Sequence, residues 1–165
     1  MLKMMLFDMV RNTAFYLLIM MSMIGLLPAC WSKQKKSGLL VVNVLSEALY
    51  DDCHIKGSMN VPFEELDSFY DTIDEDAQVV FYCSNYMCSS SGYAAKKLKS
   101  KGFKHVWAYE GGTAEWFQAG LPVEGPSKQP YLKKKMDPID QDPDVPVITT
   151  QELAQKMGYL AIGNE

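Results

Sequence analysis

Two cysteines near the middle of the chain, Cys83 and Cys88, are the side chains best suited to covalent chemistry. Cys83 directly follows residues 79–82 (VVFY), which are β-branched or aromatic throughout and predict a buried strand. Residues 89–91 are three serines that can cap the helical pattern after them. Cys83 should therefore face a helix start, where unpaired N–H groups and the helix dipole favour a thiolate. We predict that Cys83 is a catalytic nucleophile.

The segment between this strand and this helix is the predicted active-site loop. We expect the backbone N–H groups of residues 84–88 to hold an anionic sulfur on Cys83. The loop contains no positively charged side chain. Besides the catalytic Cys83, the expected site consists of Ser84, Asn85, Tyr86, Met87, Cys88 and Ser89.

The elements around the loop indicate one α/β domain. Apolar runs at residues 39–44 and 105–109 predict two further strands. Residues 46–52 predict a short helix or turn, and Pro62 fits the first turn of another helix. Two glycines at residues 111–112 predict a tight turn that opens a final helix.

Four landmarks in this order resemble a single-domain rhodanese, a sulfurtransferase domain. They are LLVVNV at residues 39–44, HIKGSMNVP at 54–62, VVFYC at 79–83 and GGTAEWFQAGLPVE at 111–124. The resemblance covers about half of the chain and implies an α/β fold with a central, mostly parallel sheet flanked by helices on both faces. It also implies that Cys83 takes a sulfane sulfur as a persulfide and passes it to a thiol.

The loop departs from the rhodanese pattern at one position that matters for the substrate. The family commonly has an arginine where Cys88 stands, so a thiosulfate ion would lose its charge partner here. The related cysteine phosphatases would need an arginine at Ser89, and a serine hydroxyl provides no bidentate clamp for a phosphate dianion. We therefore expect sulfur transfer with weak use of thiosulfate.

Other functions for the same cysteines stay open. Cys83 and Cys88 could form a redox disulfide, or Cys88 could act as a resolving thiol for a persulfide on Cys83. A catalytically inactive rhodanese-like domain that binds a partner is a further alternative. A zinc site made of Cys53, His54 and the two loop cysteines lacks the short paired spacing of structural zinc sites, so we expect no metal and no cofactor.

The N-terminus resembles a bacterial lipoprotein signal peptide. Residues 13–27 form a nearly continuous apolar run, and LLPAC at residues 26–30 resembles the cleavage box in which the cysteine becomes the lipid-bearing first residue. We expect Cys30 to be lipidated and the domain to face the periplasm from the cell envelope. The alternative is an uncleaved single-span membrane anchor.

Composition and the last part of the chain complete the prediction. The formal net charge is −4, and the chain has no basic cluster with interleaved aromatic residues, so we expect no nucleic-acid partner. The expected partners are a small sulfur donor, a protein thiol acceptor and, through the lipid, a membrane. The expected parts are a signal peptide (1–29), a tether (30–38), the rhodanese-like domain (39–124), an extended linker (125–146) and a C-terminal helical segment (147–165). We expect this last segment to pack back on the domain; the alternative is a disordered tail with a transient helix.

Overall fold

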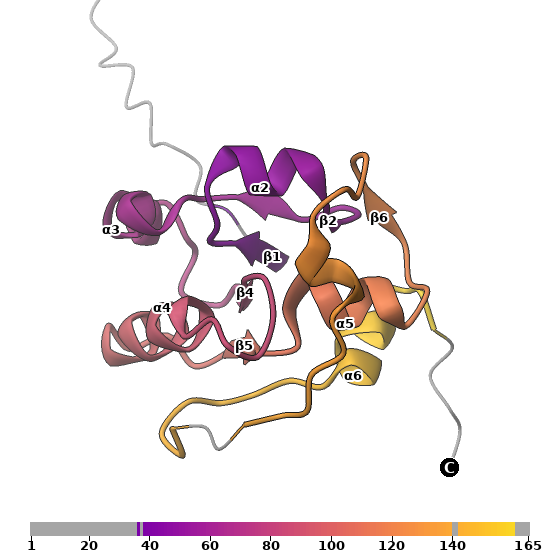
Figure 1. The fold of residues 1–165 in the computed structure, drawn as a ribbon. Coiled ribbons are helices and arrows are strands. Elements are labelled where there is room, and N and C mark those ends of the chain that lie inside the picture. The colour runs from indigo at the N-terminus through magenta and orange to yellow at the C-terminus, as the bar shows by residue number, and fades with distance from the viewer. Residues whose placement is uncertain (1–35, 37, 140–141, 161–165) are drawn as a thin grey trace, which may run out of the picture. The chain divides into compact units, whose positions relative to one another are not determined.

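A parallel β-sheet forms the centre of the fold (Figure 1). The computed structural model describes residues 36, 38–139 and 142–160. The four strands that this part of the chain contributes to the sheet lie in the order β3 (Met59–Asn60), β1 (Leu39–Asn43), β4 (Gln78–Tyr82) and β5 (Val106–Tyr109). Every neighbouring pair is parallel. β4 is therefore an inner strand, and Cys83 is the first residue beyond its carboxyl end.

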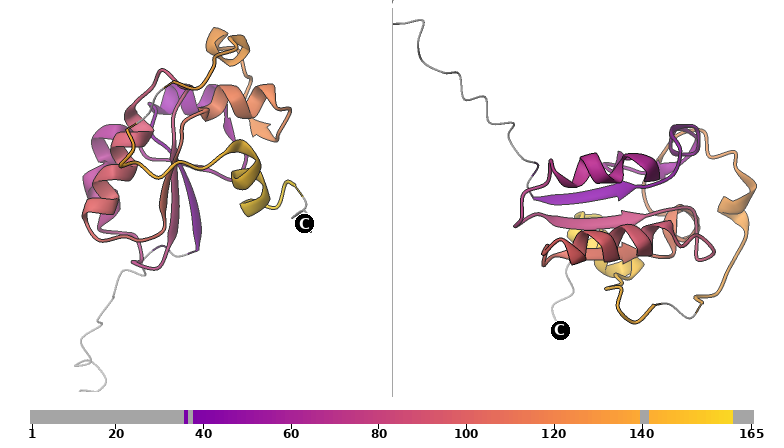
Figure 2. Two further views of the ribbon diagram at one scale, coloured as in Figure 1. Left: turned by 90° about the horizontal axis from the view of Figure 1, so that it is seen from below. Right: turned by 90° about the vertical axis from the view of Figure 1, so that its left-hand side faces the viewer.

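Helices cover both faces of this sheet (Figure 2). α3 (Leu66–Tyr70) and α4 (Ser90–Ser100) pack on one face, and α5 (Gly112–Gln118) and α6 (Thr150–Lys156) pack on the other. Along β4, Val79 and Phe81 join the core cluster of α3 and α4, whereas Val80 and Tyr82 join that of α5 and α6. Burial on both faces explains why this strand is apolar throughout. The predicted α/β fold is confirmed.

Shorter elements complete the domain. α2 (Glu47–Asp52) leads into β2 (His54–Ile55), which pairs antiparallel with β6 (Val123–Glu124). The helix expected to start at Pro62 begins as a 3₁₀ turn, η2 (Phe63–Glu65), before α3. None of the described helices combines the length and the apolarity needed to cross a bilayer.

The C-terminal segment, residues 125–139 and 142–149, runs back across the domain. Its 3₁₀ turn η3 (Pro130–Lys133) buries Leu132 completely, and the side-chain amide of Gln118 in α5 donates to the Leu132 carbonyl at 3.0 Å. Further on, the segment lies along β5. Ala108 N donates to the Pro146 carbonyl at 2.8 Å, and Ile148 N donates to the Ala108 carbonyl at 3.0 Å.

α6 then packs against the α5 side of the sheet. A capping box starts the helix: Glu152 N donates to Thr149 Oγ1 at 3.2 Å, and Thr149 N donates to Glu152 Oε2 at 2.9 Å. Leu153 is fully buried in the cluster that contains Trp116, and Met157 packs against the same cluster.

Three expectations fall on residues that the structure does not describe. These are the signal peptide (1–29), the lipidation of Cys30 and nearly all of the tether (30–38).

Candidate active site

The amino end of α5 fixes the start of the active-site loop. Thr113 donates from its backbone N–H (3.0 Å) and its hydroxyl (3.2 Å) to the Cys83 carbonyl, and Ala114 N donates to the Ser84 carbonyl at 2.9 Å. The two segments approach so closely that a Cβ on Gly112 would lie 2.6 Å from the Cys83 carbonyl oxygen. Gly112 also has a φ of +61°, which glycine adopts without strain. The Gly-Gly turn therefore holds the loop in place.

The Cys83 thiol is buried inside the loop. Its side chain has no solvent exposure, and its sulfur contacts the Cys88 carbonyl oxygen at 3.0 Å and Ser91 Oγ at 3.5 Å. Burial, and then the neighbouring Cys88, raise the pKa of Cys83 far above its usual value. In this conformation burial therefore favours the neutral thiol of Cys83, whereas the sequence predicted a thiolate held by the amides of residues 84–88. A strand end that faces a helix start favours a thiolate only where the sulfur is not enclosed.

Cys88 is the more acidic of the two loop cysteines. This side chain is partly exposed, and its pKa is lowered to about 5. The largest cause is the hydrogen bond from the Cys83 thiol, and the backbone N–H groups of Ser90 and Ser84 add to it. The Cys83 thiol itself donates to the Cys88 carbonyl oxygen. The described cysteines, Cys53, Cys83 and Cys88, are all free.

The remaining loop residues lie around this pair. Asn85 shapes the turn, because its carbonyl accepts from Cys88 N at 3.0 Å and its side-chain oxygen accepts from Met87 N at 3.0 Å. The Tyr86 hydroxyl donates to Glu115 of α5 at 2.5 Å. Ser89 precedes α4 but makes no side-chain capping bond, whereas Ser91 is buried against Cys83.

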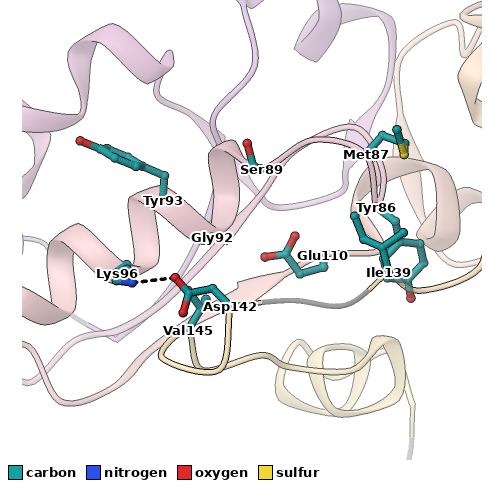
Figure 3. Close-up of a pocket in the computed structure, with 10 residues that line it drawn as sticks. All are labelled: Tyr86, Met87, Ser89, Gly92, Tyr93, Lys96, Glu110, Ile139, Asp142 and Val145. Carbon is teal, nitrogen blue, oxygen red and sulfur yellow. Dashed lines mark hydrogen bonds and ion pairs between the residues drawn. The ribbon is translucent and has the colours of Figure 1, made fainter.

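Glu110 is a site residue that the sequence reasoning missed. It follows β5, is only 7% exposed, and points its carboxylate toward α4 at Gly92 (Figure 3). Burial raises its pKa first and a negative Cys88 raises it further, while the Ser91 hydroxyl lowers it. The order of the predicted strands could have indicated this position. The carboxyl ends of adjacent parallel strands meet at one edge of a sheet, so the residue after β5 lies near the loop after β4.

A cavity of about 510 Å³ opens beside the loop (Figure 3). The loop, α4, the end of β5 and the C-terminal segment supply its walls. Its lining consists of Tyr86, Met87, Ser89, Gly92, Tyr93, Lys96, Glu110, Ile139, Asp142 and Val145. Three of the predicted loop residues therefore border a space large enough for a small molecule.

The other candidate ligands have structural contacts. His54 stacks on Tyr50 with ring centroids 3.8 Å apart, and its Nδ1 lies 2.8 Å from the Tyr50 carbonyl oxygen. Cys53 is buried and accepts a hydrogen bond from Ser127 Oγ at 3.3 Å. Within the described part of the chain, no group of three or more histidine, cysteine, aspartate or glutamate side chains could hold a metal ion.

The chain is similar to a known family of domains and to several known proteins. The rhodanese-like domain family matches the chain over residues 28–119. Thiosulfate sulfurtransferase GlpE from Coxiella burnetii (strain RSA 331 / Henzerling II) is 28% identical over 86 residues, which are 52% of this chain and 78% of that protein.

Two further proteins show the same similarity. Thiosulfate sulfurtransferase GlpE from Pseudomonas fluorescens (strain Pf0-1) is 35% identical over 82 residues, or 50% of this chain and 73% of that protein. A crystal structure of a Bacillus halodurans protein matches with a TM-score of 0.50 and 26% identity, over 55% of this chain and 66% of that one.

Proposed function

Because the chain belongs to the rhodanese-like domain family, we propose that it is a sulfurtransferase that carries a sulfane sulfur as a persulfide on Cys83. The observation that supports this most directly is the position of Cys83 at the carboxyl end of the inner strand β4, under a loop that packs Cys88 against the same core cluster. The similar proteins from Coxiella and Pseudomonas are named thiosulfate sulfurtransferases. Residues 84–89 supply no cation for a thiosulfate ion, so we propose a donor other than thiosulfate.

The proposed reaction uses both cysteines. The Cys83 thiol passes its proton to the neighbouring Cys88 thiolate. The new Cys83 thiolate attacks the outer sulfur of the donor, and the rest of the donor leaves with the electron pair of the broken bond. An acceptor thiolate then attacks the outer sulfur of the persulfide and releases the Cys83 thiolate. Because Cys83 is fully buried, the loop has to move for the donor to reach it.

Sulfur loading with matched cysteine variants tests this proposal. The protein is incubated with thiosulfate, inorganic polysulfide or glutathione persulfide, and then analysed by intact mass and by cyanolysis. Wild type and Cys53→Ala should gain the mass of one sulfur atom and release thiocyanate, whereas Cys83→Ser should do neither. Sulfur loading that survives Cys83→Ser would refute the assignment. No loading from any donor would favour a binding module without activity.

A thiol/disulfide redox function is the second candidate. It is favoured by the proximity of two free cysteines in one loop, of which Cys88 is the more acidic, since a thiolate next to a thiol is the reduced form of a redox pair. Cys88→Ser separates the two functions. A sulfurtransferase should still form the Cys83 persulfide in this variant, more slowly, whereas a redox protein should lose all activity toward disulfides.

We also propose that the chain is anchored in the cell envelope by a lipid on Cys30 and faces the periplasm. The support is the apolar run at residues 13–27 followed by LLPAC. Mass analysis of the mature N-terminus tests this proposal: a diacylated Cys30 is expected, and an intact Met1 would contradict it.

A further inference from the structure

We propose that the cavity beside the loop binds the small thiol or persulfide that exchanges sulfur with this domain, and that Glu110 makes the cavity select cationic over anionic molecules. This inference rests on the proposed sulfurtransferase function. It adds the chemical class of the exchanging molecule: an apolar thiol that carries a protonated amine.

The size and walls of the cavity fit such a molecule. Its volume of about 510 Å³ lies in the range of small-molecule sites. Tyr86 and Met87 of the loop, Tyr93 of α4, and Ile139 and Val145 of the C-terminal segment provide apolar surface. Met87 is 69% exposed and Tyr93 is 57% exposed, so both are available to contact a ligand. An inorganic ion would leave this surface unused.

The charges of the cavity favour a cation. Its one lysine, Lys96, is already neutralised, because its Nζ lies 2.6 Å from Asp142 and 3.5 Å from Asp144. Glu110 differs, since none of the described lysine, arginine or histidine side chains lies within ion-pair distance of it. A buried carboxylate without a cation is costly, and a bound ammonium group would relieve that cost.

Glu110 also lines the same cavity as the two residues that flank Cys88. Met87 and Ser89, on either side of Cys88, both line the cavity, and a charge on the Cys88 sulfur is felt by Glu110. A Cβ on Gly92 would lie 3.0 Å from Glu110 Oε1, so the glycine in α4 makes room for this carboxylate. An anionic substrate would therefore meet two negative groups, whereas an ammonium group would be attracted by both.

Two thiol reagents of opposite charge test the selectivity without requiring sulfur transfer. Cys88 is labelled with 2-aminoethyl methanethiosulfonate or 2-sulfonatoethyl methanethiosulfonate, and peptide mapping gives the rate at this residue. In either reaction the thiolate forms a mixed disulfide and methanesulfinate leaves. The ratio of the cationic to the anionic rate should exceed that of glutathione by about tenfold, the size expected for one nearby charge.

Glu110→Gln should lower this ratio by about tenfold. Glu75→Gln, which removes the same charge from an exposed site, should leave it unchanged. Glutamine has nearly the same shape as glutamate and removes a buried charge, so the variant should fold. A ratio equal to that of glutathione in the wild type, or unchanged by Glu110→Gln, would overturn the inference.

A protection experiment tests the cavity itself. Phenethylamine should slow the alkylation of Cys88 by neutral iodoacetamide, whereas 3-phenylpropionate, of similar size and opposite charge, should not. Equal protection by both, or by neither, would refute the site. Failure of the proposed function is distinguishable, because it would show as absent persulfide in the loading experiment whatever the outcome of the labelling.

Discussion

Replacing Cys83 with alanine should change the pH at which Cys88 becomes reactive. In the wild type the pKa of Cys88 is lowered to about 5, chiefly by the hydrogen bond from Cys83. The variant lacks that donor. The remaining effects oppose each other, since burial raises the pKa and the amides of Ser84 and Ser90 lower it. We therefore expect the pKa of Cys88 in the variant to approach the ordinary cysteine value of about 8.5.

The size of the effect depends on pH because two factors compete. Near pH 7, a rise in pKa from about 5 to about 8.5 lowers the thiolate fraction roughly 30-fold. The more basic thiolate is also a stronger nucleophile, by roughly 40-fold for a Brønsted coefficient of about 0.45. The rates should therefore be similar near pH 7. The wild type should be about sevenfold faster near pH 6, and the variant about 30-fold faster near pH 9.

The rate of exchange with a neutral disulfide, measured as a function of pH for the wild type and Cys83→Ala, tests this prediction. The initial release of mercaptoethanol from 2-hydroxyethyl disulfide is followed from acidic to alkaline pH, and peptide mapping confirms reaction at Cys88. Cys53→Ala serves as the control, because it removes a buried thiol that does not contact Cys88. A wild-type midpoint near the ordinary cysteine value, or the same midpoint in Cys83→Ala, would refute the assignment of the thiolate to Cys88.

Three further predictions concern stability and the loop. Burial raises the pKa of Glu110, so the charged form of this side chain destabilises the folded protein. Glu110→Gln should therefore raise the Tm at neutral pH. This gain should vanish as the pH falls below about 4.3, because the carboxyl group of the wild type is then neutral in both the folded and the unfolded state. Leu153→Ala should lower the free energy of unfolding in urea by about 2–5 kcal/mol, because Leu153 is fully buried. Gln151→Ala, at an exposed position of the same helix, should change it by less than about 0.5 kcal/mol. Equal effects of the two substitutions would show that α6 does not stabilise the domain. Gly112→Ala should raise the pKa of the loop thiolate and should destabilise the protein more than Gly102→Ala does. Both glycines have a positive φ, but only a Cβ at Gly112 would collide with the backbone. Similar thermal unfolding and similar thiol titration in the two variants would contradict this prediction.

Much of the fold could be predicted because local patterns carry it. The apolar run at residues 79–82, the serines at residues 89–91 and the Gly-Gly turn indicate a strand, a helix start and a turn, each from neighbouring residues alone. The position of the loop at the end of an inner strand followed from these elements. Their order, together with the four landmarks, was sufficient for the family.

The chemistry of the site was harder to predict because it depends on residues that are distant in sequence. The relative acidity of Cys83 and Cys88 depends on burial and on the proximity of the two side chains, neither of which is visible in the order of residues. Glu110 reaches the loop only through the pairing of β4 with β5. The cavity also needs Ile139 and Val145, from a segment expected to be only a linker.

The pairing of residues 146–148 with β5 also has a consequence for solubility. An outer strand with free main-chain groups is a template to which other molecules can add a strand. Here Ala108 exchanges hydrogen bonds with Pro146 and Ile148, so those groups are occupied by the chain itself. A form of the protein shortened before Pro146 would expose β5 along this side and should self-associate into oligomers, even if the catalytic loop remained intact.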